Sequence, residues 1–174
     1  MNQAAYDAVE EAWRLTVKAR ALCPCTSESD IGRTGYVSPP WYQTRGATYF
    51  VNLAEPLTAG DVEELRQVGG FVNRSFVISM AAILEEYGVI PYRATVDRSK
   101  NGWEHAQLTK WLRHRFAHGE WLYDPSKSNH VDTRKLLGQL FPHAVSGEPD
   151  FVTSIDGVLE PLKDGVLAYI RSAT

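Results

Sequence analysis

The feature that most constrains the fold is a long apolar stripe between Val62 and Tyr87. Large apolar side chains recur there every three to four residues, the period of one face of an α-helix. The stripe comprises Val62, Leu65, Val68, Val72, Phe76, Met80, Ile83 and Tyr87. Thr58 is expected to cap the start of this helix and Gly88 to end it. A helix of this length must bury its stripe against neighbours, so we expect it to be the central element.

Further helices are predicted on both sides of this segment. Gly69-Gly70 interrupts the long stripe and predicts a kink or a close helix crossing. Asp132 is expected to cap a helix over Asp132–Phe141, and Pro142 is expected to stop it. Pro161 predicts either a kink in the last helix or a start nearer Glu160. The additional helices are expected over Asn2–Leu22, Trp103 to the glycine at 119, Asp132–Phe141 and Asp156–Ile170.

The rest of the chain predicts little regular structure. Cys23–Pro40 is rich in Ser, Thr, Gly and Pro and has no hydrophobic period, so we expect a long loop. Gly46–Leu53 carries β-forming residues in weak alternation, which indicates one short strand. The Gly-rich phosphate loops of doubly wound folds are absent from the sequence. We therefore expect an all-α fold, a four- to five-helix up-and-down bundle forming a single domain over residues 1–174.

Composition limits the class of protein further. Hydrophobic residues make up 44% of the chain and charged residues 22%, which excludes a disordered protein. No stretch of eighteen apolar residues and no signal-peptide pattern is present, so we expect a cytoplasmic protein with no membrane partner. Cys23 and Cys25 flank Pro24 without a second cysteine pair. We therefore predict free thiols and neither a metal nor another cofactor.

A cluster of cationic and imidazole side chains ends the predicted helix that starts at Trp103. Arg113, His114 and His118 form the pattern R-H-x-x-x-H, and Gly119 follows as a helix terminator. The two histidines, four residues apart, share one helix face. Arg and His in a last turn can simply complement the negative end of the helix dipole. That interpretation does not explain two imidazoles on one face, so we also consider a site for anionic chemistry.

The run R-H-R-F-A-H-G resembles the signature of HEPN domains, an arginine followed four to six residues later by a histidine. An apolar helix precedes the motif, and a tail reading S-I-D-G-V-L-E-P-L, similar to the last helix of several HEPN proteins, follows it. The resemblance covers about Asp61–Ile170. It implies a metal-independent endoribonuclease acting as a homodimer, with the motifs of two protomers facing each other across a cleft.

The resemblance also implies a role for each motif residue. Arg113 would hold and neutralise the scissile phosphate, His118 would act in proton transfer, and His114 would orient or assist. The chemistry is consistent, because attack by a ribose 2'-hydroxyl needs a base, an acid and positive charge on the phosphoryl group. Such enzymes include toxins and defence effectors regulated by an antitoxin. The tyrosine that receives adenylyl groups in some of them is replaced here by Glu120, so that regulation is not carried over.

A basic segment leads into the motif. Residues 93–115 hold six basic and two acidic residues, a local charge of +4 in a chain of net charge −3. Such a segment would guide a phosphate backbone to one place. We therefore predict RNA contacts from Arg98, Lys100, Lys110 and Arg115. The alternative, that these residues simply solvate a loop and a helix face, carries equal weight.

Other interpretations of the motif remain open. The chain could be a non-catalytic homodimeric module that binds RNA or protein through the same residues. A His-metal site is a third alternative, although His105 lies about half a turn out of phase with His114 and no third ligand is indicated by spacing. Trp111 is expected in the core, whereas Trp103 and Trp121 are candidates for base stacking or dimer contact.

The motif's spacing leads to a prediction about assembly. Arg113 and His118 are five positions apart, about 140° round a helix axis, so one protomer does not readily direct both at one phosphate. Two protomers related by a twofold axis could do so. We therefore expect a composite site at a homodimer interface.

Overall fold

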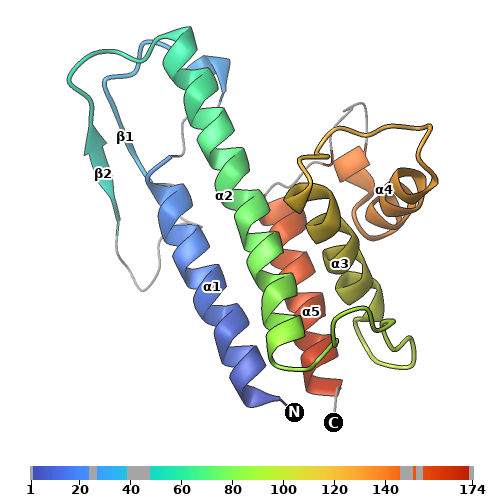
Figure 1. The fold of residues 1–174 in the computed structure, drawn as a ribbon. Coiled ribbons are helices and arrows are strands. Elements are labelled where there is room, and N and C mark those ends of the chain that lie inside the picture. Colours follow the sequence, from blue (N-terminus) through green and yellow to red (C-terminus); the bar gives the residue numbers. More distant parts are fainter. Residues whose placement is uncertain (1, 24–26, 39–47, 146–150, 152–154, 173–174) are drawn as a thin grey trace. The chain divides into compact units, whose positions relative to one another are not determined.

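The structure, a computed structural model, describes residues 2–23, 27–38, 48–145, 151 and 155–172. Its described part is mainly helical, with one two-stranded antiparallel sheet in which Tyr36 pairs with Val51 (Figure 1). The all-α class is therefore confirmed. The α-helices and strands are α1 (Gln3–Ala21), β1 (Gly35–Val37), β2 (Phe50–Asn52), α2 (Ala59–Glu86), α3 (Trp103–Ala117), α4 (Ser128–Leu140) and α5 (Glu160–Ser172). Short helical turns are η1 (Glu28–Asp30), η3 (Pro142–Val145) and the π-helical η4 (Ile155–Leu159).

The helix predicted between Thr58 and Gly88 is confirmed as α2, which runs for 28 residues, and its central position stays a prediction. Thr58 caps it as expected: the Asp61 backbone N–H donates to Thr58 Oγ1 over 3.2 Å, and the Asp61 carboxylate accepts from the Thr58 N–H at 2.7 Å. A Cβ added at Gly69 would overlap the guanidinium of Arg20 on α1. Gly69 therefore leaves room for the Arg20 side chain, and the kink or close helix crossing stays a prediction.

Three other boundaries bear on the sequence predictions. The segment predicted as a loop contains β1, which the sequence analysis missed; residues 24–26 and 39–40 of it lie outside the described part. Of the predicted strand, residues 50–52 form β2, and residues 46–47 also lie outside the described part. The last helix begins at Glu160, as one of the two alternatives for Pro161 predicted, with that proline in its first turn.

The predicted start of α4 was wrong. The helix begins at Ser128, four residues before Asp132, so Asp132 is not its cap. The turn before it is organised instead by Asp124, whose carboxylate accepts hydrogen bonds from the Ser126 N–H at 2.9 Å and from its hydroxyl at 2.7 Å. This local Asx turn brings the chain into helical conformation early.

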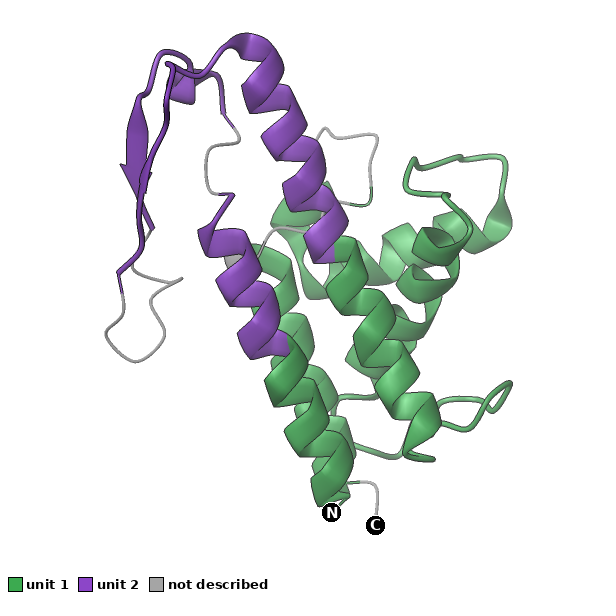
Figure 2. Cartoon of the chain, turned by 60° about the vertical axis from the view of Figure 1, so that its left-hand side comes forward, with its two compact units in different colours: residues 1–12, 74–174 green, residues 13–73 purple. Residues whose placement is uncertain are grey.

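The chain divides into two compact units, and both boundaries fall inside helices (Figure 2). Unit 1 combines residues 1–12 with 74–174, and unit 2 comprises Trp13–Asn73. The single-domain organisation stays a prediction. In unit 2, the buried side chains of Leu57 and Val62 pack with Tyr36, Leu53 and Leu65. The small sheet is thus tied to the first turn of α2.

Unit 1 holds the motif helix α3, which packs against α4 and α5. Its core includes the fully buried side chains of Phe76, Met80, Leu108, Leu112, Leu137, Leu162, Tyr169 and Ile170. Lys163 Nζ of α5 lies 3.8 Å from Glu10 Oε1 of α1, and Arg171 Nη2 donates to the Tyr6 hydroxyl at 2.7 Å. The N-terminal half of α1 therefore lies along α5, and Figure 1 shows the first turn of α1 near the last turn of α5.

Helix α2 has, among the described residues, the length and apolar content that a membrane span would need. A core helix can have the same properties, and Phe76, Val77, Met80 and Leu84 on α2 are buried in this structure. The cytoplasmic location stays a prediction.

Candidate functional site at the end of helix α3

Two left-handed glycines mark the limits of the motif helix. Gly102 has φ +78° at the N-cap of α3, and Gly119 has φ +70° just past its end. His118 is the C-cap residue, and its backbone N–H donates to the Arg115 carbonyl oxygen at 3.2 Å. Because Gly119 reverses the chain there, His118 is fixed at the open end of the helix.

The structure brings the two motif histidines together. Both His114 and His118 are exposed, and their ring centroids lie 4.6 Å apart in an edge-to-face arrangement with an interplanar angle of 62°. Partial desolvation and, next in size, the neighbouring His118 lower the pKa of His114 from its ordinary value of 6.5. A pair of imidazoles at this distance disfavours double protonation.

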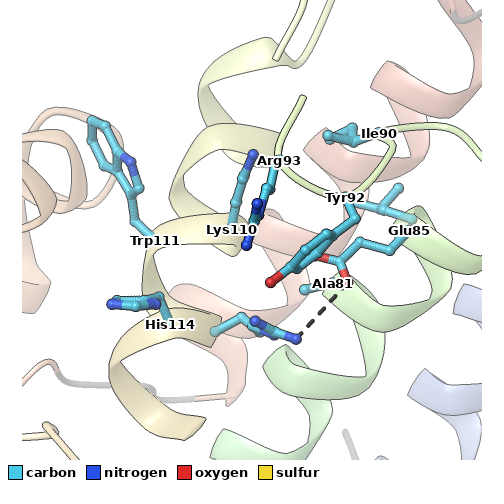
Figure 3. Close-up of a pocket in the computed structure, with 10 residues that line it drawn as sticks. Ala81, Glu85, Ile90, Tyr92, Arg93, Lys110, Trp111 and His114 are labelled. Atoms are coloured by element: carbon cyan, nitrogen blue, oxygen red, sulfur yellow. Dashed lines mark ion pairs between the residues drawn. The ribbon is translucent and has the colours of Figure 1, made fainter. Parts of the chain in front are cut away.

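Arg113 points to a different partner. Its Nη2 lies 3.8 Å from Glu85 Oε2 on α2, and it lines a cavity of about 250 Å³ together with His114. In Figure 3 the side chains of Lys110 and Arg93 lie between Trp111 on one side and Tyr92 on the other. Arg113 and His118 thus have different partners within one protomer: Glu85 for the arginine and His114 for the histidine.

The residues predicted to contact RNA have different surroundings. Lys110 lines this cavity, and its ammonium donates to the Ala94 carbonyl oxygen. Arg98 is exposed, with its guanidinium 5.2 Å from the centroid of the Trp103 ring. Lys100 is half-buried, and its Nζ lies 3.8 Å from Asp97 Oδ2. Each of these three cations remains at least partly accessible to solvent.

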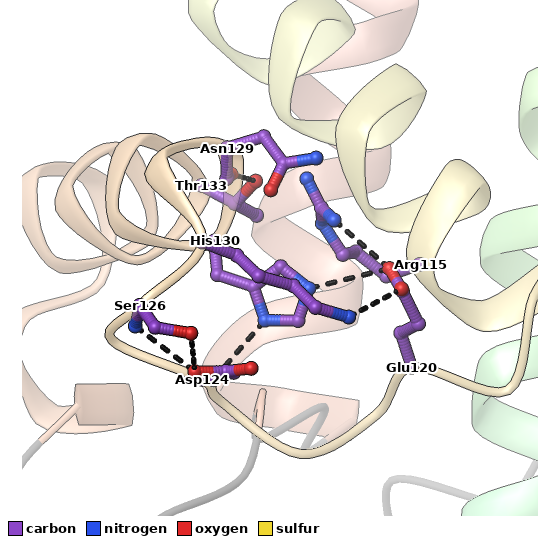
Figure 4. A network of polar contacts seen from close by, with 8 residues as sticks. Arg115, Glu120, Asp124, Ser126, Asn129, His130 and Thr133 are labelled. Atoms are coloured by element: carbon purple, nitrogen blue, oxygen red, sulfur yellow. Dashed lines mark hydrogen bonds and ion pairs between the residues drawn. The ribbon is translucent and has the colours of Figure 1, made fainter.

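Arg115 requires a correction, because it is buried at 2% exposure and its Nη1 lies 3.0 Å from Glu120 Oε2 (Figure 4). A guanidinium held inside the protein by a carboxylate cannot reach a nucleic acid backbone. We therefore leave Arg115 out of the RNA-contacting set. The sequence does contain a signal for its burial, since Arg115 is seven residues after Leu108 and three after Leu112, on the apolar stripe of α3.

Glu120 is the centre of a polar network that the sequence analysis did not anticipate. Its carboxylate also accepts from Lys127 Nζ at 2.8 Å and faces His130 Nε2 at 3.2 Å. The hydrogen bonds from Lys127, then His130 and Arg115, lower the pKa of Glu120 to about 2. The network joins the end of α3 to the first turn of α4.

His130 takes one defined tautomer in this network. The ring is buried, at 1% exposure, and its Nδ1 accepts a hydrogen bond of 3.1 Å from the Asp124 backbone N–H. The proton of the neutral ring is therefore on Nε2, from which it is donated to Glu120. His130 and Thr133 lie on the same helix face as Leu137, so the helical spacing could have indicated that this histidine is buried.

The prediction of a core position for Trp111 was wrong. The ring is half-buried and lines both the first cavity and a second one of about 340 Å³. Trp103 lines the second cavity, whereas Trp121 is 45% exposed beneath the guanidinium of Arg74, 5.3 Å from its ring centroid. Trp111 and Trp103 thus both lie on a hollowed face.

No group of three or more His, Cys, Asp and Glu side chains in the described residues is arranged to hold a metal ion. Glu120 and His130 do meet, but Arg115 and Lys127 occupy the same carboxylate. The ring of His105 packs against Gly165 on α5, and burial lowers its pKa. Cys23 is a free thiol, and Cys25 lies outside the described residues.

Comparison with known proteins gives no relative for this chain: no family model, no curated protein and no solved structure matches it.

Proposed function

We propose that this protein is a metal-independent endoribonuclease of the HEPN type. The observation that carries the proposal is the exposed contact between His114 and His118, whose ring centroids are 4.6 Å apart at the end of α3. Arg113 is adjacent in sequence and lines the same cavity as His114. Two imidazoles and a guanidinium are the groups that cleavage through a 2'-hydroxyl requires.

In the proposed reaction, a neutral imidazole accepts the proton of the ribose 2'-hydroxyl while that oxygen forms a bond to phosphorus. The bond from phosphorus to the 5'-oxygen breaks, and the imidazolium gives this leaving oxygen a proton. The products are a 2',3'-cyclic phosphate and a 5'-hydroxyl. The lowered pKa of His114 favours its neutral form near neutral pH, so His118 is assigned the proton-donor role and His114 assists as acceptor.

The proposal includes a homodimer. Arg113 of one protomer is engaged by its own Glu85, so we propose that the phosphate is held between Arg113 of one subunit and the histidine pair of the other. A protein with this activity inside the cytoplasm would need restraint, which an antitoxin or another regulatory protein would provide. A toxin or defence effector is the biological role that this chemistry supports.

The alternative is a non-catalytic homodimeric module that binds RNA or protein. The contact between Arg113 and Glu85 favours it, because a guanidinium that already faces a carboxylate has less charge available for a phosphate. This alternative predicts binding without product.

The test is incubation of RNA in EDTA with wild type, His118→Ala and His143→Ala, followed by analysis of the product ends. His143 is an exposed histidine outside the motif, bonded to the Gly157 carbonyl oxygen, and serves as the matched control. Cyclic-phosphate ends are expected from wild type and His143→Ala alone. Intact RNA in all three reactions, or equal cleavage by His118→Ala, would overturn the proposal.

A further inference from the structure

Trp111 lines two cavities on unit 1. Residues of α2, α3 and the segment between them line the first, of about 250 Å³; the second, of about 340 Å³, lies between the start of α3, Arg98 and α4. Both volumes are near the lower end of the roughly 300–1,000 Å³ of small-ligand sites. Trp111 is the one residue that contributes to both linings. A flat aromatic ring thus borders two hollows, each open to solvent.

The first cavity carries an excess of positive charge. Arg93, Lys110 and Arg113 line it against one carboxylate, that of Glu85, and Tyr92 supplies a second aromatic ring. Arg93 has φ +64° and its guanidinium lies 5.3 Å from the centroid of the Tyr92 ring. A side chain other than glycine in this backbone region is disfavoured, and such positions cluster at ligand sites.

The second cavity repeats the same chemistry. Arg98 and Lys135 line it against the carboxylate of Asp132, and Trp103 adds an aromatic wall. Arg98 lies over the Trp103 ring, so cation and ring are already paired there. Cationic side chains next to exposed rings are the combination by which proteins bind single strands, with the rings stacking on bases and the cations following the backbone.

We propose that the two cavities bind consecutive bases of single-stranded RNA on opposite sides of the Trp111 ring. The strand then runs from Lys135 past Trp111 towards His114, so that its scissile phosphate arrives at the histidine pair of the same protomer. Bases paired in a duplex are stacked on each other and cannot accept an inserted ring without unpairing, so the site selects unpaired RNA. The choice of RNA among polyanions rests on the proposed function.

The experiment measures binding in the absence of turnover. His118→Ala protein is titrated into a fluorescent single strand of about 12 nucleotides, a length within the range of single-strand sites, and into the same sequence as a duplex. Anisotropy is recorded at two salt concentrations. Loss of one base stack predicts roughly 5- to 140-fold weaker binding for Trp111→Ala in this background, whereas Trp111→Tyr retains a stacking ring and binds more tightly than Trp111→Ala.

Two variants that each remove one exposed positive charge test the path of the strand without altering the core. Lys135→Gln removes an exposed cation of the second cavity, and Arg66→Gln removes an exposed cation of unit 2. Lys135→Gln is expected to weaken single-strand binding and to reduce the salt slope by about 0.7, and Arg66→Gln is expected to change neither. Far-ultraviolet circular dichroism verifies that every variant is folded.

Each outcome decides the inference separately from the proposed enzymatic function. Single-strand binding that is undetectable, equal to duplex binding, or unaffected by both Trp111→Ala and Lys135→Gln overturns the inference, even if the wild type produces cyclic-phosphate ends. Binding that depends on Trp111 and Lys135, with no cleavage by the wild type, supports the inference and overturns the ribonuclease proposal. Should Trp111→Ala fail to fold, the comparison between Lys135→Gln and Arg66→Gln decides.

Discussion

A close approach between the start of α3 and α5 leads to a prediction about stability. Gly102 has φ +78°, and a Cβ at that position would overlap the carbonyl oxygen of Gly165 on α5. Gly88 has nearly the same backbone conformation, φ +67°, but a Cβ there would have no other atom within 4 Å. Gly102→Ala and Gly88→Ala therefore share the conformational cost and differ in the steric overlap.

The expected loss of stability follows from the conformational cost and the steric overlap. An alanine in the left-handed region costs about 1–2 kcal/mol in either variant. The overlap at Gly102 involves backbone atoms of α5 and cannot be relieved by a side-chain rotation, so it adds about 1–3 kcal/mol, as overpacking does elsewhere. The entropy that alanine removes from the unfolded chain is equal for both and cancels in the comparison.

The assay is thermal and urea unfolding of wild type and both variants, followed by circular dichroism. For a chain of 174 residues, 1 kcal/mol corresponds to about 2–4 °C, so Gly102→Ala should melt about 2–12 °C below Gly88→Ala. Equal melting temperatures for the two variants would refute the packing argument. The difference between the two melting temperatures matters for the candidate site, because the contact at Gly102 sets the axial position of the helix that carries the motif.

Two further predictions concern ionisation. The Glu120 carboxyl has its pKa lowered from 4.5 to about 2 in the folded state, so its stabilisation is present above about pH 5 and is lost as the pH falls from 4.5 towards 2. The difference in urea midpoint between wild type and Glu120→Gln should therefore be largest above about pH 5 and narrow steadily as the pH falls from 4.5 towards 2; a constant difference would contradict this. Partial desolvation and the neighbouring His118 lower the pKa of His114, so His118→Ala should raise it towards 6.5 in an NMR titration, and a decrease would contradict the interaction.

The sequence predicted the parts of the fold that depend on local patterns. The helix α2, its Thr58 cap and the glycine stop of α3 are set by neighbours within one or two helical turns, and the structure confirms them. The predicted stripe is confirmed only in part, because Val68 and Tyr87 are exposed. β1 was missed because a three-residue strand has too few positions for alternation to be visible and is defined by its pairing with β2. Strand pairing of this kind is a long-range property.

The candidate site, like the fold, was predictable where it depends on local sequence patterns and not where it depends on long-range contacts. The contact between His114 and His118 follows from helical spacing and was expected. The contact between Arg115 and Glu120 depends on the chain reversal at Gly119, and the role of Trp111 depends on where α4 lies, so neither could be taken from helix periodicity. The RNA contact of Arg115 was predicted from the local charge of residues 93–115. That charge does not depend on which face of the helix each residue occupies, so it gave no indication that Arg115 is buried.

The network around Glu120 also determines which pieces of this protein can exist separately. A fragment ending at Gly119 would keep Arg115 on the buried face of α3 and discard its carboxylate together with α4. Loss of that carboxylate would leave a buried guanidinium without its ion-pair partner, which destabilises the fold. The motif helix is therefore not portable: to graft it onto another scaffold, the loop and the first turn of α4 must be moved with it.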